Sequence, residues 1–196
     1  MKNAKTRTTI IVVLLVVAVV GYYAYLSNRS KESKAEASMT VVETTLSRDL
    51  SKDYPPTPKE VIKYYNEILR CLYNEQSTEE EIEALGLKAR ELYDDELLAA
   101  NELGTNLMML RADVQDWRSK GRRYSSFNPA SSTNVEIYDV DGSTFAKIMC
   151  GYIVMENGQN FQKNQMYLLR KDANKQWKIL GWKDMAELEQ QNQTAE

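Results

Sequence analysis

The sequence predicts an α+β fold behind one N-terminal transmembrane helix, with three helices packed on a curved antiparallel sheet of four to five strands. Three observations predict it. Residues 10–26 form an uncharged apolar run. Apolar residues then recur at helical spacing as far as about residue 120. From there the pattern changes to short runs separated by turn signals. Helices followed by strands are typical of an α+β domain.

The apolar run reads IIVVLLVVAVVGYYAYL. With its flanking hydroxyl residues, over 8–27, it reaches about 20 residues, which matches the hydrocarbon core of a bilayer. Cations precede it and tyrosines cluster at its far end, so we predict a cytoplasmic tail over 1–7 and an anchor over 8–27. A cleaved signal peptide stays open as the alternative, because Ala35-Glu36-Ala37 has the shape of a cleavage site.

The rest of the chain divides into a tether, a domain and a tail. Residues 28–48 are mostly polar, which predicts a flexible tether. The motif Tyr54-Pro55-Pro56-Thr57-Pro58 marks the beginning of the domain, which we place at 49–184, with a C-terminal tail over 185–196. This arrangement predicts a single-pass protein of the cell membrane whose domain lies outside the cytoplasm and whose first partner is the lipid bilayer.

Two capping boxes and one amphipathic run predict the three helices. Thr57-Pro58-Lys59-Glu60 and Ser77-Thr78-Glu79-Glu80 each place a capping hydroxyl three residues before a glutamate. The third helix is predicted from about Asn106 to Lys120 and ends at Gly121. Residues 94–103 predict a further short helical piece.

Alternating runs with turn residues between them predict the sheet. The dipeptide Asp141-Gly142 is a strong hairpin signal, and Asn157-Gly158 makes a second turn. The run from Ile148 onward is apolar on both faces, which is typical of a central strand covered on both sides. The predicted strands are residues 124–132, 135–140, 144–155, 161–171 and 176–183.

The composition excludes several classes of function. The chain has no histidine, which removes Ser-His and Cys-His nucleophile pairs and histidine-ligated metals. Its net charge of -3 disfavours nucleic-acid binding, because that binding depends on neutralising phosphates. Cys71 and Cys150 could form one disulfide or remain two buried thiols. No motif predicts a metal, a cofactor or a catalytic residue.

The meander that closes in Trp177-Lys178-Ile179-Leu180-Gly181-Trp182, after three helices, resembles the NTF2-like cone fold over about residues 49–183. The resemblance implies a bent sheet that wraps the helices and leaves a pocket. Ketosteroid isomerase and its dehydratase relatives place a carboxylate or histidine with a tyrosine there, and no acid here matches theirs. The segment 54–58 with the helix after it resembles an uncharacterised family of membrane-anchored proteins from Gram-positive bacteria, which implies no activity.

Three groups of side chains are candidates for a site. The aromatic residues that could line a cone pocket, or else belong to the core, are Tyr65, Trp117, Tyr152 and Trp182. The cations that could contact an anionic polymer or lipid surface, or else stabilise a helix C-terminus, are Arg118, Lys120, Arg122 and Arg123. Asp113 and Asp116 could do acid/base work if one were desolvated, and are otherwise solvated helix residues.

Taken together, these features favour a membrane-tethered extracytoplasmic binding or assembly domain without enzymatic activity, working with a protein partner or by self-association. The alternative is a small-molecule-binding protein or an acid/base enzyme that uses the cone pocket. A third hypothesis is an extracytoplasmic sensor, which would need a partner within the membrane because its predicted cytoplasmic part is so short.

Overall fold

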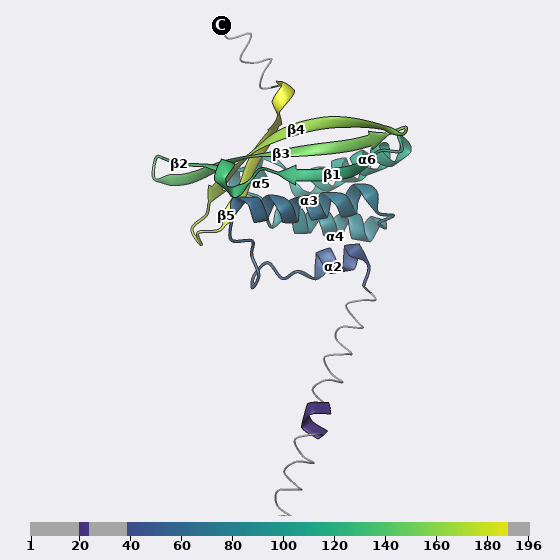
Figure 1. The fold of residues 1–196 in the computed structure, drawn as a ribbon, viewed down its shortest axis with the longest axis horizontal. Coiled ribbons are helices and arrows are strands. Elements are labelled where there is room, and N and C mark those ends of the chain that lie inside the picture. Colours follow the sequence, from purple (N-terminus) through teal and green to yellow (C-terminus); the bar gives the residue numbers. More distant parts are fainter. Residues whose placement is uncertain (1–19, 24–38, 188–196) are drawn as a thin grey trace, which may run out of the picture. The chain divides into compact units, whose positions relative to one another are not determined.

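The computed structural model describes residues 20–23 and 39–187 (Figure 1). The chain divides into two units, residues 1–40 and 41–196. As far as it is described, the second unit contains α-helices α2 (Val41–Ser47), α3 (Pro58–Asn74), α4 (Glu79–Arg90), α5 (Asp95–Ala100) and α6 (Leu103–Ser119). Its strands are β1 (Arg123–Pro129), β2 (Glu136–Val140), β3 (Ser143–Glu156), β4 (Gln159–Lys171) and β5 (Trp177–Asp184).

The predicted fold class is wrong in its transmembrane helix. Among the residues that the structure describes, no helix has both the length and the apolar character needed to cross a membrane. The anchor predicted over 8–27 lies outside the described residues except for 20–23. The predicted tail over 1–7 also lies outside them. The fold class is therefore corrected to an α+β unit with a five-stranded antiparallel sheet.

Part of the predicted tether forms helix α2. Val42 and Thr45 are buried against the helices that come after it in the chain. The Tyr64 hydroxyl donates a hydrogen bond to the Thr45 carbonyl at 2.7 Å, and the Cys71 thiol donates one to the Thr45 hydroxyl at 3.3 Å. The sequence pattern missed this helix because its few apolar residues become buried only against a surface supplied by α3 and α4.

Helices α3 and α4 begin with side-chain caps. Thr57 accepts a hydrogen bond from the Glu60 backbone N–H at 3.3 Å, as predicted. In α4 the capping residue is Thr78, one residue later than predicted, and it forms a capping box with Glu81. The Ser77 hydroxyl instead donates to the Cys71 carbonyl at 2.9 Å, because Ser77 is buried under the end of α3.

Helix α6 begins earlier than predicted. The Glu102 carboxylate caps it by accepting hydrogen bonds from the backbone N–H groups of Gly104 and Thr105. Its close approach to α4 depends on Gly86, where an added Cβ would come within 2.8 Å of the Leu110 side chain. Gly86 thus places α6 directly against α4, and both helices contribute to the wall of one cavity.

The strands form one antiparallel sheet in the order β1-β3-β4-β5. One edge of β3 pairs with β4 along most of its length. On the other edge, β2 pairs with the first part of β3 and β1 pairs with the second part. The β2–β3 and β3–β4 hairpin turns each have two consecutive residues with positive φ, Asp141-Gly142 and Asn157-Gly158, which matches the two-residue hairpin signals in the sequence.

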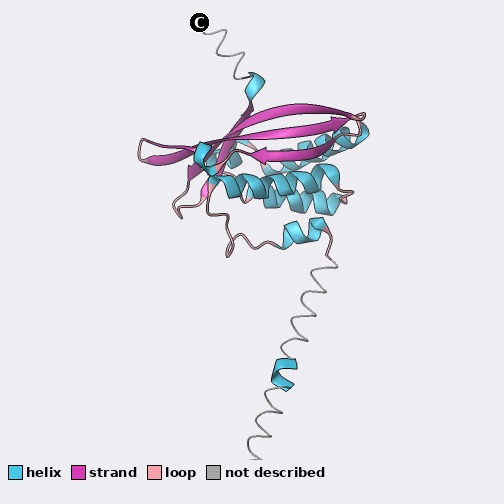
Figure 2. Ribbon diagram, viewed as in Figure 1, coloured by secondary structure: helices cyan, strands magenta, loops and turns pink. Residues whose placement is uncertain are grey.

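Helices cover one face of this sheet in the described part of the chain (Figure 2). On β3 the side chains alternate, so that Ile148 and Cys150 are buried beneath the helices while Met149 and Ile153 are exposed on the other face. The prediction that this strand is covered on both sides is wrong for the residues described. Cys71 and Cys150 are both free, buried thiols, and burial raises the pKa of each.

Candidate ligand-binding cavity

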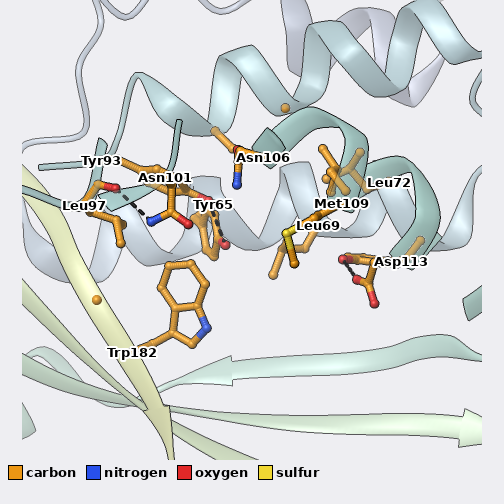
Figure 3. Close-up of a pocket in the computed structure, with 15 residues that line it drawn as sticks. Tyr65, Leu69, Leu72, Tyr93, Leu97, Asn101, Asn106, Met109, Asp113 and Trp182 are labelled. Atoms are coloured by element: carbon orange, nitrogen blue, oxygen red, sulfur yellow. Dashed lines mark hydrogen bonds between the residues drawn. The ribbon is translucent and has the colours of Figure 1, made fainter. Parts of the chain in front are cut away.

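A cavity of about 560 Å³ lies between helices α3, α4 and α6, the short helix α5 and strand β5 (Figure 3). Its size lies within the usual range for small-molecule sites. Most of its wall is apolar or aromatic. The aliphatic and methionine side chains in the wall are Leu69, Leu72, Ala89, Leu97, Met109 and Leu110.

Three aromatic rings meet at one end of the cavity. Tyr65 comes from α3, Tyr93 from the connection after α4, and Trp182 from β5. Their ring centroids lie 5.8–6.1 Å from one another in every pairing. Figure 3 shows the Trp182 ring reaching from the strand toward the helices, and 39% of this residue is exposed. Trp182 therefore presents an aromatic ring to whatever occupies the space.

The hydroxyls of Tyr65 and Tyr93 bond to each other at 3.3 Å. Burial is the main cause that raises the pKa of both groups above the ordinary tyrosine value. Both hydroxyls therefore stay neutral at physiological pH. This end of the cavity combines ring faces with neutral hydroxyls and carries no ionised group from these two residues.

Two amides add polar groups to the wall. The Asn101 Nδ2 donates to the Leu97 carbonyl at 2.9 Å. The Arg90 guanidinium donates to the Asn101 carbonyl at 2.8 Å and to the Asn106 Oδ1 at 3.2 Å. Because Arg90 occupies the oxygen of Asn106, the Nδ2 of that amide points into the cavity (Figure 3). Arg90 itself is not one of the residues that line the cavity.

A carboxylate marks the other end. Asp113 on α6 is exposed at the rim and accepts a hydrogen bond from the Tyr73 hydroxyl through Oδ2. Burial, together with this bond to a carboxylate, raises the pKa of the Tyr73 hydroxyl. The hydrogen bond leaves Oδ1 without a partner among the described residues. In Figure 3, Tyr93 and Leu97 lie at one end of the cavity and Asp113 at the other, with Leu69 and Met109 between them.

The four aromatic residues predicted to line a pocket divide into two pairs. Tyr65 and Trp182 lie side by side in the cavity. Trp117 instead stacks on Tyr124, with ring centroids 4.9 Å apart, and Tyr152 is buried with its hydroxyl 2.6 Å from that of Tyr167. No sequence pattern singled out Tyr93, Asn101 and Asn106 as cavity residues. Tyr93, Asn101 and Asn106 belong to no functional motif, and their place in a cavity depends on how the helices pack.

The four predicted surface cations do not act as one group. Lys120 pairs with Asp116 at 2.6 Å and Arg122 pairs with Glu156 at 2.9 Å. Arg118 is turned inward, toward the end of α3. Arg123 lines a second hollow, of about 520 Å³, together with Arg70. Three of these four side chains are therefore engaged within the protein, Arg118 and Arg122 by tertiary contacts and Lys120 by a pair at i,i+4 spacing at the end of α6.

Replacing Arg118 with alanine is expected to lower the free energy of unfolding by about 2 kcal/mol. Its guanidinium donates hydrogen bonds to the carbonyls of Glu75 at 2.9 Å, Ser77 at 3.3 Å and Leu72 at 3.4 Å. These carbonyls lie at the end of α3 and in the turn after it, and most would lose their donor. Urea unfolding followed by circular dichroism measures the change.

Arg118→Lys is the matching variant, because an ammonium keeps the charge but not the planar fork of donors. We expect it to recover less than half of the lost free energy. Full recovery would show that the planar fork of the guanidinium is not needed and that an ammonium group caps these carbonyls equally well.

The comparisons with known proteins add one family. A family model described as "Domain of unknown function (DUF6715)" matches residues 1–182. Among the curated proteins nothing matches the chain. Since the family description names no activity, the geometry of the cavity is the basis for assigning a function.

Proposed function

Since the chain belongs to this family of domains of unknown function, we propose from its geometry that it is a binding domain for a small, largely apolar molecule. The observation that carries the proposal is the cavity of about 560 Å³ whose wall combines aliphatic side chains with three neighbouring aromatic rings. Apolar walls with a few placed polar groups are typical of small-molecule sites.

The wall supports recognition better than proton transfer. Asp113 is the carboxylate of the cavity, and it is exposed at the rim with one oxygen held by Tyr73. A general acid or base is usually desolvated so that its proton affinity matches the reaction. A solvated, oriented carboxylate instead suits the binding of a ligand group. We therefore favour a binding role over the alternative of an acid/base enzyme.

The resemblance to the NTF2-like family supports a ligand-binding role in general, although this cavity is lined mainly by helices and takes only Gly181 and Trp182 from the sheet. Members of that family keep a ligand pocket between their helices and a bent sheet, and here helices also precede an antiparallel sheet in the chain. A location outside the cytoplasm and assembly with a protein partner, both predicted from the sequence, stay predictions.

The test is calorimetric titration of the full chain with a neutral apolar probe, N-phenyl-1-naphthylamine. We expect saturable binding to a single site. Met109→Trp should place a large side chain in the cavity and weaken the affinity about tenfold, equivalent to about 1.4 kcal/mol. Met109 is 64% exposed and lines the cavity, so it has room for the larger group.

Met108→Trp is the matched control. Met108 precedes Met109 on α6, is 62% exposed and does not line the cavity. The affinity of this variant should equal that of the wild type. Equal weakening by both substitutions, or no saturable binding to the wild type, would refute the proposal.

A further inference from the structure

The side chains that line the cavity carry charge of one sign only. Among the described residues that line it, Asp113 is the one side chain with a formal charge, and no lysine or arginine is present. Arg90 does not line the cavity, and its Nη1 donates to the Asn101 backbone carbonyl and to the Asn106 Oδ1. Its charge acts on Tyr93, at the end of the cavity away from Asp113. The wall therefore has one negative charge, set at one end of a mostly apolar space.

The Asp113 carboxylate has no ion-pair partner among the described residues. Asp116, three residues further along α6, pairs with Lys120 at 2.6 Å. Arg122, a cation within electrostatic reach of Asp113, is held by Glu156 at 2.9 Å. The hydrogen bond from Tyr73 orients the Asp113 carboxylate at the rim and leaves Oδ1 available. A cation that enters here would meet an oriented acceptor with an unused oxygen.

The rings of the cavity also favour a positive charge. Aromatic faces attract ammonium groups through their quadrupole, and Tyr73 places such a ring beside Asp113. Leu69 and Met109 lie between Asp113 and the aromatic end formed by Tyr65, Tyr93 and Trp182 (Figure 3). One ligand could therefore hold a charged group at the rim and an apolar body along the wall.

We propose that the ligand of this cavity is an organic cation, an amine or quaternary ammonium compound with an apolar body, whose charged group binds at Asp113. The proposal rests on the proposed function, because it names the ligand class of the same cavity. Charge complementarity distinguishes this ligand from a fatty acid or a phosphorylated compound, whose anionic group would face the Asp113 carboxylate.

The test compares three probes that share an octyl chain: octyltrimethylammonium, octyl glucoside and octyl sulfate. Each is titrated calorimetrically into the full chain below its micelle concentration. We expect the cation to bind about fivefold more tightly than the neutral glucoside, since an exposed charge pair and a cation–π contact are each worth modest energy. Octyl sulfate should bind most weakly.

Two matched variants locate the effect. Asp113→Asn keeps an oxygen that can accept from Tyr73, so the fold should persist, and the preference for the cation should disappear. Asp116→Asn removes the same charge from the same helix outside the cavity and should keep the preference. Circular dichroism checks that both variants are folded.

The outcomes separate the two proposals. If no octyl probe binds at all, the proposed function fails, and this inference fails with it. If the probes bind but the glucoside or the sulfate binds as tightly as the cation, only the inference on charge is overturned. It is also overturned if Asp113→Asn keeps the preference, or if Asp116→Asn loses it equally.

Discussion

Replacing Ile148 with alanine is expected to lower the free energy of unfolding by about 3.5 kcal/mol. Ile148 is fully buried on β3, where it lies opposite Tyr167 of β4 and belongs to the core shared with the helices. The substitution removes apolar contact and leaves a void, and β3 cannot move to fill it because it is paired on both edges. Urea unfolding with circular dichroism measures the loss.

Met149→Ala is the control for this prediction. Met149 is the next residue of the same strand and points to the other face, where it is 41% exposed. Its replacement should cost less than about 1 kcal/mol. Equal losses for the two variants would contradict a fold in which helices cover only one face of the described sheet.

Replacing Asp94 with alanine is expected to lower the free energy of unfolding by about 3 kcal/mol. The Asp94 side chain is only 5% exposed, and both of its oxygens accept from Arg170, at 2.5 and 3.0 Å. One of them also caps α5 by accepting from the Glu96 backbone N–H at 3.0 Å. The substitution would leave the guanidinium without its buried partner and the first turn of α5 without its cap.

The Asp94 substitution should also weaken ligand binding. The Asp94 N–H donates to the Ile179 carbonyl and the Ile179 N–H donates to the Leu92 carbonyl, both at 2.8 Å, so this segment is attached to the edge of β5. Asp94→Ala keeps these backbone bonds but removes the side-chain cap from the first turn of α5, the helix that carries Leu97 in the cavity wall. Calorimetry with N-phenyl-1-naphthylamine under conditions where the variant is folded should show reduced affinity.

Glu96→Ala provides the comparison, because Glu96 bonds the same guanidinium from an exposed position. An exposed ion pair is worth little, and we expect a loss below about 1 kcal/mol. A loss as large as that of Asp94→Ala would show that the burial of Asp94 is not what makes its pair important.

Most elements of the domain were predictable because their signals are local. The cap at Thr57 and the turn at Asp141-Gly142 depend on a few neighbouring residues and on backbone dihedral preferences. Signals failed where contacts outside the local motif competed. Ser77 was expected to cap α4 but is buried beside Cys71, so Thr78 became the cap. Helix α2 was missed because its partners are α3 and α4.

The candidate site was less predictable than the fold. Tyr65 and Trp182 come from opposite ends of the domain and meet only because β5 returns beside α3. Trp117 was one of the aromatic residues that could line a pocket, yet its ring stacks on Tyr124 instead. Asp113 and Asp116 look alike in the sequence, and only the structure pairs one with Lys120 and leaves the other at the rim of a cavity.

The sequence by itself determined the order of the helices and strands after α2, most of their boundaries and the absence of histidine chemistry. These follow from composition and from interactions within a few residues of the chain. The tertiary structure decided which aromatic rings face a cavity and which charges remain unpaired. Those properties depend on which surfaces meet after folding, because a side chain is buried, paired or available only in relation to partners that are remote in the sequence.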